Sequence, residues 1–126
     1  MVTMSAIQQV IEAPVPPQAQ PVAPIDRVHL ARMTLGERSL ECEVLALFLR
    51  QADMLMRRMG RAERDVVAAA AHTLKGSARG IGAWQVAGAA ERVEHANRAR
   101  LDTALAELGV AIDEAKAVIV ELLREH

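Results

Sequence analysis

Residues 101–122 read LDTALAELGVAIDEAKAVIVEL, and the apolar side chains in this stretch recur in alternating steps of four and three residues. The positions on this line are Leu101, Leu105, Leu108, Ile112, Ala115, Ile119 and Leu122. Steps of four and three place them all on one face of an α-helix, as in helices that pack against other helices along their whole length. The segment therefore predicts a long amphipathic helix close to the C-terminus.

The residues before this segment predict further helices. From Ile25 onward the chain has no proline and few β-branched residues, while Ala, Leu, Glu and Arg dominate, a composition that favours helix. We expect a short helix over about 27–34 with Asp26 as its N-cap, a helix that ends near Gly60, and helices over about 61–79 and 83–98. The inner positions expected in the three longer ones are Leu40, Val44, Phe48, Ala52, Leu55 and Met59; Val67, Ala70, Leu74, Ser77 or Ala78, and Ile81; and Val86, Ala90, Val93 and Asn97.

Four long amphipathic helices with short connections bury their apolar lines most simply around one shared core. We therefore expect an all-α fold, an antiparallel up-down-up-down four-helix bundle with a short extra N-terminal helix, over residues 26–126. All 5 prolines lie before Ile25, and Glu12 is the one charged residue in that stretch. Residues 1–25 are accordingly predicted to form a Pro-rich flexible tail or linker.

Composition excludes or disfavours several classes of partner and location. The chain of 126 residues suits one domain, and 15 Lys and Arg against 16 Asp and Glu give a net charge of −1, which offers no basic field for nucleic acid or membrane. No apolar run is long enough to span a bilayer, and the N-terminus lacks the basic region of a secretory signal. The single cysteine, Cys42, lies in an apolar run and is expected to be reduced. We expect a cytoplasmic monomer.

One segment stands out chemically: residues 72–82, HTLKGSARGIG, which follow the run VVAAAA. On a helical wheel of about 100° per residue, His72 points away from the inner positions and so faces solvent. The other members of this outward face are Ala68, Ala69, Lys75, Gly76 and Arg79. A glycine inside a helix costs roughly 1 kcal/mol relative to alanine, so Gly76 indicates a need for space beside the histidine. Small neighbours around an exposed imidazole imply that a second protein comes close to the ring.

Three kinds of chemistry could involve an exposed imidazole at His72. A metal site needs further ligands at helical spacing, and none lies at positions 68, 69, 75 or 76, so no metal is expected. A general base normally needs a pocket, which an exposed helix face does not provide. A nucleophile that accepts an anionic group from an external donor fits better, with neutral Nε2 attacking and Lys75 offsetting the charge of the transferred group.

The segment resembles the signature of histidine-containing phosphotransfer (HPt) domains, H-x-L-K-G-S-A with a glycine ten residues after the histidine. The matching residues are His72, Leu74, Lys75, Gly76, Ser77, Ala78 and Gly82, and the predicted helices agree over about residues 26–124. The resemblance implies a four-helix bundle that presents one histidine to the aspartyl phosphate of response-regulator receiver domains. It also implies a sensor or hybrid histidine kinase as an upstream partner, no cofactor of its own, and Mg²⁺ bound to the partner receiver.

The resemblance also implies roles for individual residues. His72 would be the phosphorylated residue, Lys75 a cation on the phosphate side, and Gly76 the gap through which a receiver reaches the ring. Family members place a Glu or Gln 22 residues after the histidine, here Glu94, to hold the Nδ1–H of the ring. Arg98, expected one turn later on the same helix face, could then reach the phosphoryl group.

Two other functions are alternatives for a helical chain with an exposed histidine. A helical interaction module that binds partners without phosphotransfer would more naturally lack His72 or Lys75, and both are present. The dimerisation helix of a sensor kinase carries an acidic residue and a proline after its histidine, whereas this chain has neither and has no room for an ATP-binding domain. We therefore expect no autokinase activity, and we expect His29, His95 and His126 to lie on the solvated surface and Trp84 to pack, partly buried, over one end of the bundle.

Overall fold

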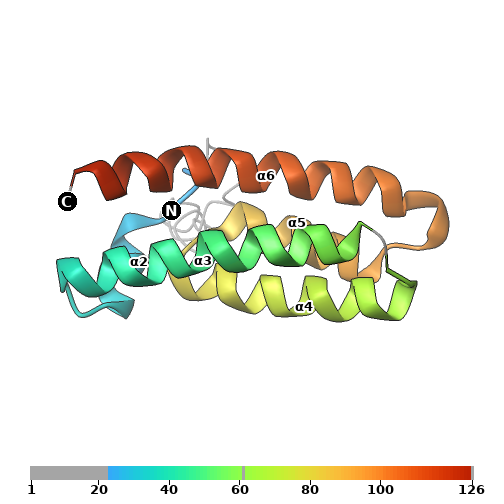
Figure 1. Cartoon of the computed structure of the whole chain (residues 1–126), viewed down its shortest axis with the longest axis horizontal. Coiled ribbons are helices and arrows are strands. Elements are labelled where there is room, and N and C mark those ends of the chain that lie inside the picture. Colours follow the sequence, from blue (N-terminus) through green and yellow to red (C-terminus); the bar gives the residue numbers. More distant parts are fainter. Residues whose placement is uncertain (1–22, 61, 126) are drawn as a thin grey trace, which may run out of the picture.

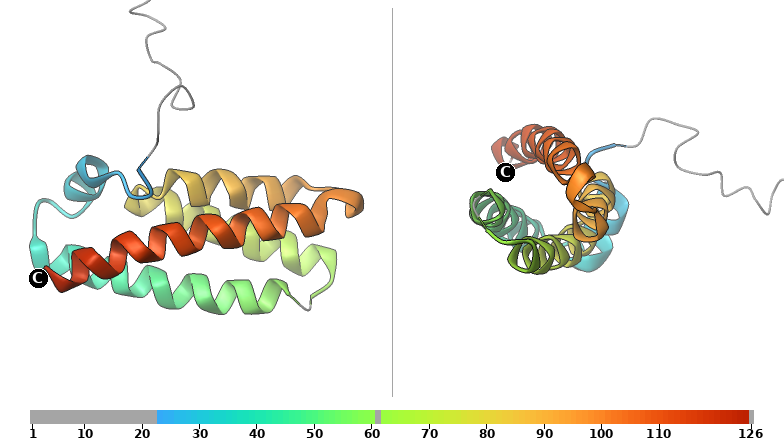
Figure 2. Two further views of the ribbon diagram at one scale, coloured as in Figure 1. Left: turned by 90° about the horizontal axis from the view of Figure 1, so that it is seen from above. Right: turned by 90° about the vertical axis from the view of Figure 1, so that its right-hand side faces the viewer.

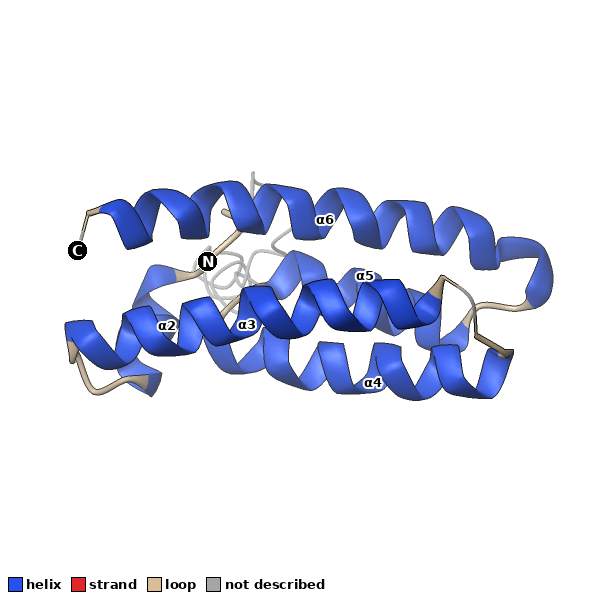
Figure 3. Ribbon diagram, viewed as in Figure 1, coloured by secondary structure: helices blue, strands red, loops and turns tan. Residues whose placement is uncertain are grey.

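The structure, a computed structural model, describes residues 23–60 and 62–125. Its helices are α2 (Arg27–Met33), α3 (Arg38–Met59), α4 (Arg64–Ile81), α5 (Trp84–His95) and α6 (Arg98–Arg124). The described part of the chain contains no strand, and Figure 3 shows helices joined by short loops. The prediction of an all-α protein with a short extra helix before four longer ones is confirmed.

The four longer helices lie along a common axis (Figure 1), and their buried apolar side chains form one core. Along the chain each of them packs on the next, α3 on α4, α4 on α5 and α5 on α6, and α6 also contacts α3. Figure 2 shows this arrangement end-on, with the short α2 outside it, and α2 packs against α4. Helix α4, which carries HTLKGSARGIG, is therefore flanked by α3 on one side and by α5 on the other.

Most of the predicted inner positions are buried. The line of α6 that begins at Leu108 is in the core, as are Phe48 of α3, Leu74 of α4 and Val86 of α5. Two predictions were wrong. Leu40 is 37% exposed because it lies in the first turn of α3, and Asn97 is exposed because it caps the next helix instead of continuing α5.

Several helix ends differ from the sequence-based expectations. Helix α4 begins at Arg64, not near 61, and continues through Gly80 to Ile81, so Gly80 lies inside the helix and Gly82 alone ends it. Helix α5 stops at His95, three residues before the expected end. The side chain of Asn97 accepts the backbone N–H of Arg100 and thereby starts α6 earlier than the apolar line indicated.

The N-terminal helix is attached to the bundle through Asp26. Its side chain caps α2 by accepting the N–H of His29 at 3.0 Å, as predicted, and it also accepts Nε1–H of Trp84 at 2.9 Å. The backbone N–H of Asp26 donates to the carbonyl of Gly82 at 2.9 Å. Gly82 has φ +81°, and a Cβ at that position would lie 2.8 Å from the carbonyl oxygen of Asp26. Glycine is therefore required both by the turn and by the close approach of α2.

His29 and Trp84 pack against each other beside this attachment. Their ring centroids are 4.8 Å apart, and Nε2 of His29 lies 2.9 Å from the carbonyl oxygen of Arg79. Trp84 is 39% exposed, which confirms its expected position as a partly buried cover at one end of the bundle. The expectation that His29 is simply solvated was wrong, because its ring contacts both Trp84 and the last turn of α4. His95 is exposed as expected, and His126 lies outside the described residues.

The expected tail falls largely outside the described residues, which begin at Ala23. Ile25, the last residue of that expected tail, is 2% exposed and belongs to the hydrophobic core. The packed part of the chain thus includes Ile25, while the division into a tail and a bundle stays a prediction. In the described ranges, no helix is long and apolar enough to cross a membrane.

Candidate functional site

His72 projects from the middle of α4 into solvent. On the inner side of α4, the nearby residues Ala71 and Leu74 are completely buried, whereas the His72 side chain is 68% exposed. This confirms the orientation inferred from the helical wheel. An imidazole in this position is accessible to a second protein and contributes little to the core.

Glu94 of α5 reaches across to the ring of His72. Its Oε2 lies 2.9 Å from Nδ1 of His72, and the Glu94 side chain is only 18% exposed. The contact is possible because α4 and α5 are packed side by side. Because a carboxylate can only accept, the neutral ring of His72 carries its proton on Nδ1, and Nε2 holds the free electron pair.

Lys75 is bound to the other oxygen of the same carboxylate. Its Nζ donates to Oε1 of Glu94 at 2.8 Å, and its side chain is 11% exposed, so it lies along the surface between α4 and α5. This hydrogen bond, followed by the one from His72, lowers the pKa of Glu94 below its ordinary value, against the opposing effect of burial. Glu94 is therefore held as a carboxylate that joins Lys75 to His72.

The residues next to His72 on the open side of α4 are small. A Cβ built on Gly76 would have nothing within 4 Å, and the same is true of Gly80 one turn later. Ala69 is exposed and Ala68 half-buried. The packing of this chain therefore does not require a glycine at position 76, which leaves space beside the ring for a group from outside.

Two predicted cations have different positions. Arg79 lies two turns after His72 on α4, and its Nη2 is 3.6 Å from Oε1 of Glu91 on α5. Arg98 is not on the same helix as Glu94: α5 ends at His95, and Arg98 is the first residue of α6. The expectation that Arg98 lies one turn after Glu94 on one face was wrong, because the chain turns at Ala96 and Asn97.

Arg64 also lies at this site, although it is not among the residues predicted from the sequence. This residue starts α4, two turns before His72, and its Nη2 donates to the carbonyl oxygen of Ala96 at the end of α5. Together with Ala68 and Glu94 it lines a hollow of about 290 Å³ between α4 and α5. The spacing of 64, 68 and 72 on one helix face was the available signal.

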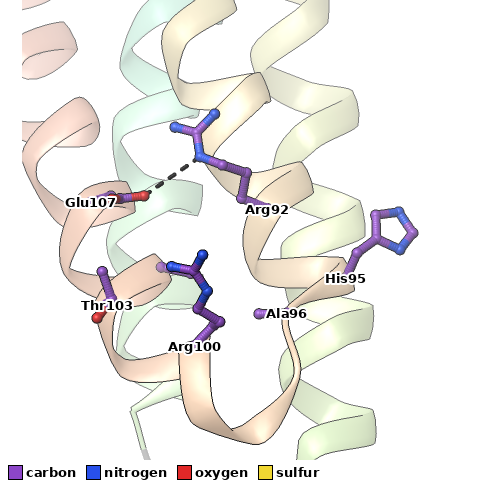
Figure 4. Close-up of a pocket in the computed structure, with 7 residues that line it drawn as sticks. Arg92, His95, Ala96, Arg100, Thr103 and Glu107 are labelled. Atoms are coloured by element: carbon purple, nitrogen blue, oxygen red, sulfur yellow. Dashed lines mark ion pairs between the residues drawn. The ribbon is translucent and has the colours of Figure 1, made fainter.

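The described residues give little support for a metal site, a second reactive pocket or a phosphate-binding loop. Among residues 23–60 and 62–125, no group of three or more His, Cys, Asp or Glu side chains could hold a metal ion. A hollow of about 520 Å³ lies between α5 and α6, where Arg92 pairs with Glu107 at 3.5 Å (Figure 4). His95 lines this hollow but points away from the Arg92–Glu107 pair in the same view. The glycines of HTLKGSARGIG lie within α4 or at its end, unlike those of a phosphate-binding loop, which follow a strand.

Comparison with known families gives one match. The family model described as Hpt domain matches residues 43–122, more than half of the chain. The matched region includes His72, Lys75, Gly76 and Glu94, and it begins after α2. No curated protein and no solved structure matches the chain.

Proposed function

Because this chain belongs to the Hpt domain family, whose members carry out histidine phosphotransfer in phosphorelays, we propose that His72 is its phosphoryl acceptor. In this proposal His72 takes a phosphoryl group from an aspartyl phosphate of one receiver domain and passes it to an aspartate of another. The observation that supports it best is the exposed imidazole whose Nδ1 is held by Glu94 at 2.9 Å, with Nε2 free.

The reaction is a nucleophilic displacement at phosphorus. The electron pair on Nε2 attacks the phosphorus atom, the bond from phosphorus to the aspartyl oxygen breaks, and the aspartate leaves as a carboxylate. Nδ1 keeps its proton throughout, so the ring becomes cationic as the N–P bond forms. The negative carboxylate of Glu94, within hydrogen-bond distance of Nδ1, stabilises this developing positive charge. The reverse sequence delivers the phosphoryl group to the second receiver.

Lys75 acts through Glu94 in this account. The resemblance to HPt domains places its ammonium on the phosphate side, whereas in this structure Nζ is bound to Oε1 of Glu94. We assign Lys75 the role of holding Glu94 in place and ionised, with its positive charge one turn from the incoming phosphoryl group. Gly76 with Ala68 and Ala69 would provide the clearance for the partner.

The arginines have supporting roles in this proposal. Arg79, which is half-exposed beside Glu91, is the better placed to meet an anionic partner because it lies on the same helix as His72. Arg98 starts the next helix, and its proposed contact with the phosphoryl group has no support from the geometry around Glu94.

We further propose that the chain is a phosphotransfer intermediate and not an enzyme with its own ATP site. Hpt domains interact in general with receiver domains and kinases, and we propose that the phosphate reaches His72 through such partners, with Mg²⁺ held by the receiver. We also propose that the chain is cytoplasmic and monomeric, and that its four longer helices run in up-down-up-down order. The two-residue connections between α4 and α5 and between α5 and α6 support that helix order, because short links favour antiparallel neighbours.

The proposal is tested by incubating the chain with a phosphorylated receiver and following the label. His72→Gln is expected to stay folded and to accept no phosphate, because the ring lies outside the core. His95→Gln is the matched control, since His95 is also an exposed histidine of this bundle, and it should be labelled like the unchanged protein. Labelling of the His72→Gln variant would mean that another residue is the acceptor and would contradict the assignment of His72. A folded wild type that binds receivers and is never labelled would support a binding module instead.

A further inference from the structure

The hollow between α5 and α6 contains two arginines that the proposed phosphotransfer does not use. It has a volume of about 520 Å³ and is lined by Arg92 and His95 of α5 and by Arg100, Thr103 and Glu107 of α6, with alanines between them. We call it the α5/α6 hollow. We propose that it is a docking site for an acidic segment of a partner protein, whose carboxylates bind to Arg92 and Arg100.

Arg100 is the unpaired cation of the α5/α6 hollow. Figure 4 shows its guanidinium on the same side of the two helices as that of Arg92. Within the part of the chain that the structure describes, no carboxylate is close enough to form an ion pair with Arg100. A guanidinium can bind a carboxylate through two parallel hydrogen bonds. Arg100 can therefore accept a carboxylate from outside without giving up an ion pair within the chain.

Arg92 is paired, but weakly. Its Nε lies 3.5 Å from Oε1 of Glu107, which is longer than the roughly 3 Å of a hydrogen bond between such groups. The two side chains are 61% and 53% exposed, and ion pairs this open to solvent contribute little to stability. The pair shows that a carboxylate fits against Arg92, and a carboxylate from a partner could replace Glu107 there at little cost.

The position of the arginines on α6 does not favour the helix itself. Arg98 and Arg100 lie in the first turn of α6, and that turn contains no acidic residue. Positive side chains in a first turn are electrostatically unfavourable, because the helix dipole makes that end positive as well. Their positive charge is therefore not explained by helix stability, and an acidic partner would neutralise it.

The lining of the α5/α6 hollow suits a polypeptide better than a small organic ligand. Sites for small ligands are mostly walled by apolar and aromatic side chains. No Phe, Tyr or Trp is among the described residues of this lining, and its polar members Arg92, Arg100 and Thr103 are all exposed. Exposed charges of this kind contribute to the rate and specificity of association between complementary protein surfaces.

A second hollow of the bundle, between α3 and α6, has a different charge balance. It has a volume of about 400 Å³, and its charged lining residues are Arg50, Asp53, Asp113 and Lys116. Two cations and two carboxylates cancel there, whereas the α5/α6 hollow has two arginines and one carboxylate. Arg50 is therefore a matched control for an exposed arginine in a hollow without excess positive charge.

The α5/α6 hollow lies on the opposite side of α5 from His72. Arg92 and Glu94 are two residues apart on α5, which separates them by roughly 160° around the helix. Glu94 binds His72 and Lys75 of α4, whereas Arg92 pairs with Glu107 of α6. A segment bound in the hollow thus leaves the ring of His72 uncovered. If the proposed function holds, a partner can be held there while His72 exchanges its phosphoryl group.

The experiment measures the binding of a fluorescein-labelled oligoglutamate peptide to the whole chain by fluorescence anisotropy, with an oligoglutamine peptide as the neutral probe. We expect Arg92→Gln and Arg100→Gln each to weaken binding at least fivefold. Glu107→Gln, which removes the competing carboxylate, should strengthen binding at least threefold. The controls Arg50→Gln and Glu114→Gln make the same changes in net charge at exposed positions outside the hollow and should change the affinity less than twofold. The oligoglutamine peptide should not bind.

Three results would overturn the inference. These are the absence of saturable oligoglutamate binding, equal weakening by Arg50→Gln and Arg100→Gln, and displacement of the peptide by equimolar inorganic phosphate at constant ionic strength, which would assign the hollow to small anions. Melting temperatures are compared for all variants; if one arginine variant unfolds early, the other arginine variant and Glu107→Gln decide. His72→Gln should bind the peptide like the unchanged protein, so failure of phosphotransfer at His72 would count against the proposed function and leave this test intact.

Discussion

Lys75 of α4 and Glu94 of α5 are joined by a 2.8 Å ion pair, and the second oxygen of the same carboxylate lies 2.9 Å from Nδ1 of His72. One carboxylate therefore serves two partners, and both approach it from α4. The bundle creates this arrangement by packing α4 on α5 at the level of His72. Lys75, three positions after His72, therefore influences how the ring of His72 is held in the resting chain. It does so through Glu94, which belongs to another helix, α5.

We predict that Glu94→Gln retains the fold but slows phosphotransfer by about tenfold or more. The amide can still accept from Nδ1, but it carries no charge to stabilise the cationic ring and no longer binds the ammonium of Lys75 as an ion pair. Single-turnover transfer from a phosphorylated receiver measures the effect. Glu91→Gln is the control, since Glu91 lies on the same helix and pairs with Arg79 instead of His72 and Lys75; equal rates for the two variants would contradict the role given to Glu94.

We predict that Gly76→Ala is as stable as the unchanged protein or more stable by up to about 1 kcal/mol, whereas Gly76→Gln folds but transfers poorly. The reason is that a Cβ at Gly76 has nothing within 4 Å in the chain, so only an external partner would meet the new side chain. Thermal melts and transfer rates test the two effects separately. Gly80→Ala provides a reference for adding a methyl group in open space on the same helix; a destabilised Gly76→Ala beside a stable Gly80→Ala would mean that Gly76 serves the fold.

We predict that Gly82→Ala is destabilised by more than about 1 kcal/mol. Gly82 has φ +81°, and the added Cβ would lie 2.8 Å from the carbonyl oxygen of Asp26, so both the turn and the docking of α2 are strained. Chemical denaturation measures the loss. An unchanged midpoint would contradict the close approach of Asp26 to Gly82.

We predict that the stability contributed by Asp26 is lost in acid. Hydrogen bonds from Nε1 of Trp84, and then from the backbone of His29, lower the pKa of Asp26 below its ordinary value. A carboxyl group with a depressed pKa stabilises the fold above the pKa of the unfolded chain, and this contribution disappears as the pH falls through the lower folded value. Asp26→Asn should therefore show a weaker loss of stability between neutral and strongly acidic pH.

The single tryptophan of the chain makes this measurement direct, because Trp84 lies at the attachment of α2 and its emission reports on that contact. Asp26→Ala, which removes the N-cap side chain altogether, should also cost roughly 0.5–2 kcal/mol at neutral pH. Parallel acid profiles for Asp26→Asn and the unchanged protein would show that the carboxylate does not contribute in this way.

Much of the fold could be predicted because the apolar periodicity of this chain is regular. The 3.6-residue repeat of a helix was enough to predict the apolar line from Leu101 to Leu122. The outward position of His72 followed from the buried positions around it. The helix ends were harder, because Asn97 could be read either as the last turn of one helix or as the cap of the next. Its side-chain hydrogen bond to Arg100 decides for the cap, and that choice moves Arg98 away from Glu94.

The site could be predicted only in part for a related reason. Small residues and a histidine on one face of α4 are visible in the sequence, but contacts across helices depend on the relative height of α4 and α5. The relative position of the two helices along their axes lets Nζ of Lys75 bind Glu94 and lets Arg64 bind the carbonyl oxygen of Ala96. Residue spacing within one helix cannot indicate either contact. Likewise, nothing in the spacing of His29 indicates that it packs against Trp84, more than fifty residues later in the chain.

The most direct test of the central claim is to locate the phosphoryl group by NMR on protein with ¹⁵N-labelled histidine. Before phosphorylation, the account predicts that the neutral ring of His72 carries its proton on Nδ1. After incubation with a phosphorylated receiver, it predicts ³¹P–¹⁵N coupling to Nε2 of His72, with the Nδ1 proton retained. Coupling to Nδ1, or to any nitrogen of another histidine, would contradict the account.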